Sequence, residues 1–521
     1  MSFTSRPVRE EKKPSKLRRY AAFVLPMIRS GMQFQKHFEH AKEEDLAKVK
    51  RERTLKRTIT ILLSALLVLL LLIGTLKVLV RLKALTLSMA SIAGVTLSTD
   101  ANGFTNILLL GEGDNNHDGV DLTDTVMIAS LDPKNTKSAV LLSIPRDTYV
   151  LSTEKMGKDR INSLYRNYKN FLVRKGTSKP EASTESMQEL EKEIGSHIGL
   201  SLHGAIKVNF SGFIEAIDAI GGIDVEVPSD IVDPEYPGPN YTYETFQIAK
   251  GVQHLDGATA LKYARSRHST SDFSRSFRQQ QIITAAAKKV KEGGLIKNAS
   301  KLTELLSIIS KNVESTLSTR ELLGLADMGK AIDTHKIVST QLNDQNGLFG
   351  SGIEQGGFLY SPPREEFDGA AVLLPVSIPA LPVTWKQIQK FVTLLLIHRE
   401  IFINPPTITI LNGGAKEGLA RKLGGELYRY NMNILGTRNY GPKGSPIFDT
   451  SFIAINPSLL GGGDETKDSL LRAQKTSVLL STILKLTERK ISDVAPFEKD
   501  AADIVIVLGK DFGYTPLQEL L

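Results

Sequence analysis

Residues 104–111 read FTNILLLG, an apolar run that ends in glycine and leads into a loop rich in acidic residues. Such a run is typical of a buried β-strand. Two similar runs follow, Val126 to Leu131 and Ala139 to Ile144, and the turn segment DPKN lies between them, which predicts adjacent strands with a hairpin-like connection. Helical patterns follow farther along. We therefore expect a mixed α/β domain over residues 102–345, with a central sheet flanked by helices.

The rest of the chain after this domain divides in two. Residues 346–405 are rich in glycine and proline, which indicates a connection. A new alternation of β and α patterns begins with TITILNGG at residue 407, and we expect a smaller C-terminal α/β domain over residues 406–521. Within the first domain, residues 228–243 hold four prolines among acidic and aromatic residues. We expect this segment to be irregular and to serve as a lid or substrate loop.

The segment before the first domain predicts a membrane anchor. Residues 58–76, TITILLSALLVLLLLIGTL, carry no charge over 19 positions, enough to cross a hydrocarbon core of roughly 30 Å as a helix. Residues 1–57 contain 16 lysines or arginines and 7 acidic residues. Because positive flanks stay inside, we expect an uncleaved signal anchor with a cytoplasmic tail, a stalk over residues 77–101, and an extracellular body on the cell membrane. A buried core helix is the alternative for the apolar segment.

Composition excludes several classes of protein. The 521 residues include no cysteine, which rules out disulfide scaffolds, thiolate metal sites and cysteine nucleophiles. The formal net charge is +8, and the tail balance of 16 − 7 = +9 leaves the body at about −1. Since the body is nearly neutral, we expect no binding to nucleic acid.

The acidic loop after the first strand reads GEGDNNHDGVDLTDT, residues 111–125. Its carboxylates are Glu112, Asp114, Asp118, Asp121 and Asp124. Hard oxygen ligands of this kind suit Mg²⁺, and a loop leaves coordination positions for water and phosphate oxygens. The alternative is an acidic turn, in which Asp and Asn side chains bond to their own backbone.

An arginine follows one of the predicted strands. In SIPRDTYV, residues 143–150, Pro145 ends the strand and Arg146 stands at its carboxyl end, where α/β sheets bind ligands. The planar guanidinium suits bidentate phosphate binding. A salt bridge from Arg146 to Asp147, or to a neighbouring strand, is the alternative.

A second group of arginines lies in YARSRHSTSDFSRSFRQQQ, residues 263–281. Arg265 and Arg267 are two residues apart and would project to one side of an extended segment. Arg275, Arg278 and Gln279 would share one face at the start of a helix. Arginines beside a helix N-terminus favour a polyanion site, because a solvated basic face would have lysines and acids interleaved.

Six sequence motifs occur in order along the first domain. They are NILLLGEGD, HDGVDLTDTVMIASLDP, LLSIPRDTYV, INSLY, FIEAIDAIGGIDVEVP and HLDGATALKYARSRHSTSDFSRSFRQQQ. Together they closely resemble the catalytic domain of the LytR-CpsA-Psr family of cell-envelope enzymes, and the resemblance covers residues 102–340. A single membrane span with a basic tail is similar to the usual layout of that family. Residues 406–514 resemble the accessory C-terminal domain that some members carry.

The resemblance implies a phosphotransferase that takes a glycopolymer from a polyprenyl diphosphate carrier and joins it to peptidoglycan through a phosphodiester bond. It implies Mg²⁺ or Mn²⁺ as cofactor, with Asp124 as a ligand. Asp114 is a candidate second ligand, because Gly113 stands where many members have aspartate. The residues that would bind the diphosphate are Arg146, Arg265, Arg267, Arg275, Arg278 and Gln279. The expected catalytic residues are Asp124, Arg146, Arg265, Arg267 and Arg275.

Two other functions fit parts of this pattern. Many members of the family have arginine where this chain has Leu122, so a cation near the phosphates is missing or is supplied from elsewhere. A non-catalytic scaffold could bind a lipid-linked diphosphate through the same arginines, although it would not need the carboxylate of Asp124. A membrane-tethered transcriptional regulator is the other alternative, but the basic tail is short for a DNA-binding fold.

Overall fold

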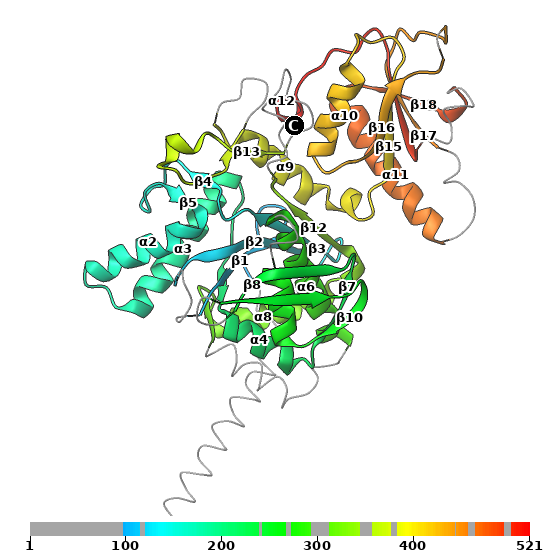
Figure 1. Ribbon diagram of the computed structural model, residues 1–521. Coiled ribbons are helices and arrows are strands. Elements are labelled where there is room, and N and C mark those ends of the chain that lie inside the picture. Colours follow the sequence, from blue (N-terminus) through cyan, green and yellow to red (C-terminus); the bar gives the residue numbers. More distant parts are fainter. Residues whose placement is uncertain are drawn as a thin grey trace, which may run out of the picture. The chain divides into compact units, whose positions relative to one another are not determined.

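The computed structural model describes residues 97–114, 120–238, 242–266, 272–292, 312–343, 357–376, 383–442, 444–456, 464–493 and 502–521. All of them belong to one compact unit, Gly94–Leu521 (Figure 1). The expected tail over residues 1–57, the expected membrane span over residues 58–76 and the stalk up to residue 96 lie outside the described residues. Within the described ranges, no helix has both the length and the apolar character needed to cross a membrane.

A six-stranded sheet lies at the centre of the first domain. Its order is β11-β6-β1-β2-β3-β12. The strands are β1 (Thr105–Glu112), β2 (Thr123–Asp132), β3 (Ser138–Ile144), β6 (Ala205–Val208), β11 (Val313–Ser315) and β12 (Ile337–Gln341). β1 runs antiparallel to β2 and parallel to β6, and β3 runs antiparallel to β2 and parallel to β12. The carboxyl ends of β1, β3, β6 and β12 therefore meet at one edge of the sheet, where β2 begins.

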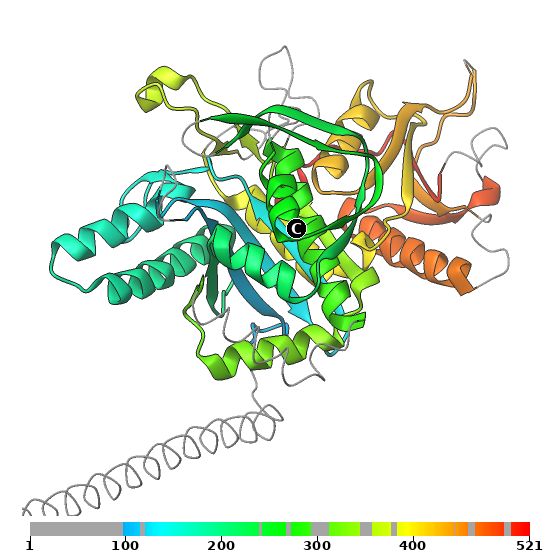
Figure 2. The same ribbon diagram turned by 60° about the horizontal axis from the view of Figure 1, so that its bottom comes forward.

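Helices cover both faces of this sheet (Figures 1 and 2). α2 (Ile161–Arg174) and α3 (Lys179–Ile198) pack on one face, where Leu108 and Leu142 enter the same core as Leu164 and Leu190. α6 (Asp272–Glu292) and α8 (Thr319–Ala331) cover the other face. The domain is thus a mixed α/β fold with a central sheet flanked by helices, as the apolar runs predict.

A second layer of elements follows β6. It contains α4 (Phe210–Ala219), β7 (Ile223–Val227), β8 (Ile231–Pro237), β9 (Tyr243–Ile248), β10 (Gly251–Leu255) and α5 (Gly257–Arg265). β7 pairs with β10, β8 pairs with β9, and these elements share a core of their own with α6. Shorter elements elsewhere are β4 (Tyr149–Val150), β5 (Asp159–Arg160) and η3 (Thr334–Lys336).

The expectation that residues 228–243 are irregular is wrong, because β8 falls inside this segment and pairs antiparallel with β9. The register shifts between Asp233 and Tyr236, so Pro234 lies in the irregularity. A two-stranded ribbon has an unpaired side on each strand, and prolines are tolerated at such edges and at bulges. The prolines therefore shape the ribbon rather than prevent it.

The glycine- and proline-rich stretch over residues 346–405 contains packed elements in its described part. They are β13 (Leu359–Tyr360), η4 (Arg364–Phe367), β14 (Leu374–Pro375), α9 (Lys386–Ile397) and η5 (Arg399–Phe402). Phe391 of α9 stacks on Phe358 with ring centroids 4.6 Å apart. The buried guanidinium of Arg399 donates to the carbonyl and hydroxyl oxygens of Ser130 on β2. Buried aromatic and hydrogen-bonding contacts thus join this stretch to the central sheet.

A five-stranded sheet in the order β16-β15-β19-β17-β18 forms the C-terminal region. Its strands are β15 (Thr407–Asn412), β16 (Asn433–Asn439), β17 (Phe452–Ile455), β18 (Thr487–Lys490) and β19 (Ile504–Leu508). The helices are α10 (Leu419–Arg429), α11 (Asp464–Leu484), η7 (Ile491–Asp493) and α12 (Leu517–Leu520). The strand predicted from TITILNGG is β15, and its neighbours β16 and β19 run parallel to it.

Candidate functional site

Asp124 and Arg146 meet at the edge of the central sheet where β2 begins. Their positions follow from the register, because Val126 of β2 pairs with Ile144 of β3 and each residue lies two positions farther toward the same edge. Nη1 of Arg146 lies 3.2 Å from Oδ1 of Asp124. The amide of Asn162 in α2 donates to the same oxygen at 3.0 Å. The sheet edge and the first turn of α2 together fix the carboxylate of Asp124.

This cluster remains open to solvent. The side chain of Asp124 is 44% exposed and that of Arg146 is 22% exposed. Arg146 also pairs with Asp147, whose carboxylate in turn pairs with Arg160. Both predicted salt bridges of Arg146, to its neighbour and across the strands, are therefore present. A carboxylate and a guanidinium at an accessible sheet edge can bind a charged ligand from solvent.

The other described carboxylates of the acidic loop have separate partners. Asp121 pairs with Lys169 of α2 at 2.6 Å. Asp114 accepts hydrogen bonds from the backbone N–H and the hydroxyl of Ser211, in the first turn of α4, at 3.1 and 2.8 Å. Asp118 lies outside the described residues. No group of three or more His, Asp or Glu side chains among the described residues could hold a metal ion.

Glu112 belongs to a buried ionic network at the same edge. Nζ of Lys207 lies 2.7 Å from Oε1 of Glu112 and 3.1 Å from Oε1 of Glu314, and the lysine side chain is only 1% exposed. Burial raises the pKa of Glu112, against the opposing charge of Lys207. Burial alone would lower the pKa of Lys207, but Tyr165 and Glu112 outweigh it and raise that pKa, so the ammonium stays charged. Lys207 is closed to solvent, whereas the side chain of Glu314 is 49% exposed, and the network holds β1, β6 and β11 together.

Arg265, the last residue of α5, lies among aromatic side chains. Its guanidinium carbon is 4.3 Å from the ring centroid of Phe210 and 5.5 Å from that of Tyr236. Nη1 of Arg265 donates to the hydroxyl of Tyr236 at 3.1 Å. These contacts fix the plane of the guanidinium.

The remaining residues of the predicted arginine group differ in environment. Arg278 is buried, and it donates to the backbone carbonyl oxygens of Tyr263, at 2.8 Å, and of Ser266. Burial lowers its pKa. Arg275 is also buried, whereas Gln279 is half-buried on α6. Arg267 lies outside the described residues. Arg278 thus serves to hold the end of α5 against α6.

Three polar residues of this region are not singled out by the sequence patterns. Asn162 lies in the INSLY motif, but the contact with Asp124 spans 38 residues and needs the fold to be recognised. Lys207 is a lone lysine in an apolar strand, a signal that could have indicated a buried ion pair. Asp233 is fully buried in the proline-rich ribbon and accepts a hydrogen bond from Ser266 at 2.7 Å.

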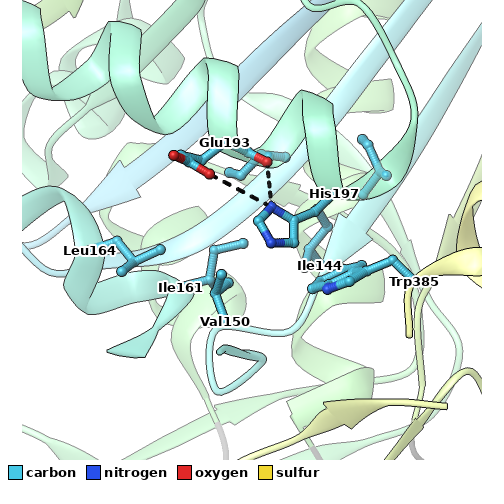
Figure 3. Close-up of a pocket in the computed structure, with 9 residues that line it drawn as sticks. Ile144, Val150, Ile161, Leu164, Glu193, His197 and Trp385 are labelled. Carbon is cyan, nitrogen blue, oxygen red and sulfur yellow. Dashed lines mark hydrogen bonds and ion pairs between the residues drawn. The ribbon is translucent and has the colours of Figure 1, made fainter. Parts of the chain in front are cut away.

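A small pocket lies between β3, α2 and α3 (Figure 3). Its aliphatic lining residues are Ile144, Val150, Ile161, Leu164, Ile194 and Ile198. Glu193, His197 and Trp385 also line it, and the ring centroids of His197 and Trp385 lie 5.1 Å apart in an edge-to-face arrangement. Ile144 is the last residue of β3. One lining residue of the pocket, Ile144, is therefore only two residues from Arg146 along the chain.

Sequence comparison finds relatives that are cell-wall transferases by name. The chain is 34% identical over 219 residues to the polyisoprenyl-teichoic acid–peptidoglycan teichoic acid transferase TagU of Oceanobacillus iheyensis, covering 42% of this chain and 60% of that protein. It is 31% identical over 229 residues to the corresponding transferase TagV of Bacillus subtilis, covering 42% of this chain and 52% of that protein. The matches thus span between half and two thirds of these relatives.

The chain was also compared with solved structures and with models of protein families. The crystal structure of B. subtilis TagV aligns with a TM-score of 0.39 at 25% identity, over 56% of this chain and 96% of that one. Residues 406–512 match the model described as LytR cell envelope-related transcriptional attenuator. Residues 81–368 match the model of the LytR_cpsA_psr family. This match spans more than half of the 521 residues, and the chain therefore belongs to the LytR_cpsA_psr family.

Proposed function

We propose that the protein is a membrane-anchored phosphotransferase that moves a glycopolymer from a polyprenyl diphosphate carrier to peptidoglycan through a phosphodiester bond. The observation that carries this proposal is the solvent-accessible cluster of Asp124, Arg146 and Asn162 at the edge of the central sheet. The names of the relatives, which are teichoic acid transferases acting on peptidoglycan, support the same type of reaction.

The residues of the cluster have distinct roles in this proposal. Arg146 binds an oxygen of the diphosphate and neutralises negative charge on it, because its guanidinium is permanently charged and forked. Asn162 and Arg146 orient the carboxylate of Asp124 through its Oδ1 atom. Phosphoryl transfer depends mainly on positioning and charge stabilisation, so no covalent nucleophile of the protein is needed.

The donor set at Asp124 fits a magnesium ion. Mg²⁺ is usually held by one or two carboxylates together with substrate phosphates and water, rather than by a cage of protein ligands. Asp124 is an accessible carboxylate, and Asp114 already accepts two hydrogen bonds from Ser211. In our proposal Asp124 holds Mg²⁺ or Mn²⁺. The ion, when bound, supplies additional positive charge at the diphosphate.

The lipid part of the substrate has a suitable neighbour in the aliphatic pocket of Figure 3. Because its wall begins at Ile144, a prenyl chain between β3 and the α2–α3 pair would leave its diphosphate beside Arg146. The pocket is small, so we propose that α2 and α3 separate from the sheet when the lipid enters.

The location of the protein is part of the proposal. We infer a single membrane span over residues 58–76, a cytoplasmic N-terminus and an extracellular catalytic body, from the charge difference around that segment. Protease added to intact cells should digest the chain after residue 83 and spare the tail. Protection of the body would contradict this orientation.

A transfer assay tests the function. The full-length protein in detergent is incubated with a polyprenyl diphosphate sugar and peptidoglycan, with and without Mg²⁺, and the transferred sugar is measured. We expect Mg²⁺-dependent transfer, and a decrease of about 10-fold or more in Arg146→Lys, since lysine keeps the charge but loses the fork. Arg320→Lys, an exposed arginine on α8, is the matched control. Binding without transfer would instead indicate a non-catalytic scaffold.

A further inference from the structure

The proline-rich ribbon of β8 and β9 contacts the end of α5, where Arg265 lies. The hydroxyl of Tyr236 accepts a hydrogen bond from Arg265 at 3.1 Å, and Oδ2 of Asp233 accepts one from the hydroxyl of Ser266 at 2.7 Å. A third connection is the ion pair between Lys262 of α5 and Glu244 of β9, at 2.7 Å. Asp233 and Tyr236 are 0% and 2% exposed. Three side-chain contacts therefore join the ribbon to the last turn of α5 and to the residue that follows it.

The irregularity in β8 is what brings both ribbon residues to this side. In a regular strand, residues three positions apart point to opposite faces. Asp233 and Tyr236 are nevertheless both buried, while Pro234 and Glu235 between them are exposed. The register shift between Asp233 and Tyr236 accounts for this, since a bulge re-aims the side chains that follow it. The proline that disfavours a regular strand thus lies where the contact with α5 requires an irregular one.

The side chains around Arg265 fix the orientation of its guanidinium group. Phe210 of α4 and Tyr236 of β8 both lie within cation–π distance of the guanidinium. The hydroxyl of Tyr236 also accepts a hydrogen bond from an N–H group of Arg265. A planar group held by two rings and a hydrogen bond loses little further freedom when it binds an anion. An exposed arginine that merely balances surface charge would not need these contacts.

We propose that Tyr236, with Phe210, is a positioning residue that sets Arg265 for a diphosphate ligand, and that the β8–β9 ribbon is a fixed brace rather than a lid. Asp233 extends the brace to Ser266, the residue after Arg265. The inference rests on the proposed function, because it takes its ligand from there. It assigns Tyr236 and Phe210 a positioning role that the sequence patterns do not predict.

The test measures binding of farnesyl diphosphate to the full-length protein in detergent by calorimetry, at a fixed concentration of MgCl₂. Tyr236→Phe keeps the ring and removes the hydroxyl, and we expect the Kd to rise roughly five- to tenfold without a change in melting temperature. Tyr243→Phe makes the same substitution at an exposed tyrosine on β9 and should leave the Kd unchanged. Phe210→Leu, which removes the other ring, should also weaken binding.

A double-mutant cycle separates positioning from a general structural role. In the Arg265→Lys background, Tyr236→Phe and Phe210→Leu should each change the Kd by less than about twofold, because the group that they orient is gone. Equal effects in both backgrounds, or equal effects of Tyr236→Phe and Tyr243→Phe, would overturn the proposal. Absence of farnesyl diphosphate binding by the wild type would overturn both this proposal and the proposed function. Coupled binding without sugar transfer would overturn the transferase alone.

Discussion

The two edges of the central sheet use polar side chains in different ways. At the edge where β2 begins, charged side chains face other side chains, as in the pairs Asp124–Arg146 and Glu112–Lys207. At the opposite edge, Asp132 bonds to both the backbone and the side chains of the turn that follows β2. Oδ1 and Oδ2 of Asp132 each accept a backbone N–H of the β2–β3 turn at 3.0 Å, from Asn135 and Thr136 respectively.

The difference indicates which edge is available for chemistry. A side chain bonded to backbone groups is committed to holding a turn, and its loss is felt as lost stability. Side chains paired with one another can exchange partners with a ligand, provided that they are accessible. Asp124 meets this condition, whereas Lys207 at the same edge does not. Location at the carboxyl edge is therefore insufficient, and accessibility decides between a binding role and a structural one.

The largest effect that we predict separates these two kinds of ion pair. Lys207→Met should lower the free energy of unfolding by about 3–5 kcal/mol, because it leaves the buried carboxylate of Glu112 without its cation. Denaturant unfolding of the full-length protein measures this. Lys510→Met is the matched control: Lys510 pairs with Asp449 at 2.8 Å on an exposed surface, so its loss should change the free energy of unfolding far less. Similar losses in the two variants would show that accessibility does not divide the ion pairs as we argue.

The second prediction concerns the accessible carboxylate. Asp124→Asn keeps an oxygen that can accept from Arg146 and Asn162 but removes the negative charge, and we expect transfer to fall by about 100-fold or more. The free energy of unfolding should change by less than about 1 kcal/mol, because the side chain is partly exposed. Asp327→Asn, at a surface ion pair on α8, provides the comparison and should leave transfer unchanged. Transfer at the wild-type rate in Asp124→Asn would remove this residue from the reaction.

Much of the fold can be predicted from the sequence, for a physical reason. The runs that become β1, β2, β3 and β19 are largely apolar because these strands are buried on both faces. Even the pairing of Asp124 with Arg146 could be predicted in principle, since a hairpin-like connection between β2 and β3 fixes the register. The β8–β9 ribbon could not be predicted in this way, because a bulge that contains proline has the same local sequence pattern as a loop.

The roles of individual arginines could not be predicted from spacing alone. Arg265 and Arg278 belong to one basic cluster in the sequence, yet Arg265 lies between aromatic rings and Arg278 donates inward to backbone carbonyls. The difference depends on which side of α6 packs against α5, and that is set by contacts far along the chain. Arg399 shows the same limit, because its partner Ser130 is 269 residues away. Long-range packing, not local pattern, decides whether an arginine is available to a ligand.

The smallest predicted effect is a pH dependence at the edge opposite the site. Nδ1 of His203 accepts the backbone N–H of Asn106 at 3.0 Å, which requires an unprotonated nitrogen. Burial lowers the pKa of His203 below the ordinary value of 6.5, and the nearby carboxylate of Asp100 offsets this only in part.

Because the unfolded chain then binds the proton more tightly, the stability from this contact is fully present above pH 6.5 and is lost as the pH falls through the folded-state pKa. His203→Gln offers an amide oxygen that does not titrate, so the variant should lose less stability than the wild type when the pH falls from 7 to about 5, below the ordinary pKa of 6.5. Denaturant unfolding of both proteins at the two pH values measures this, and all other titrating groups cancel in the difference. Parallel losses would mean that His203 does not bond to the backbone as a neutral ring, and the contrast between the two edges of the sheet would lose one of its supports.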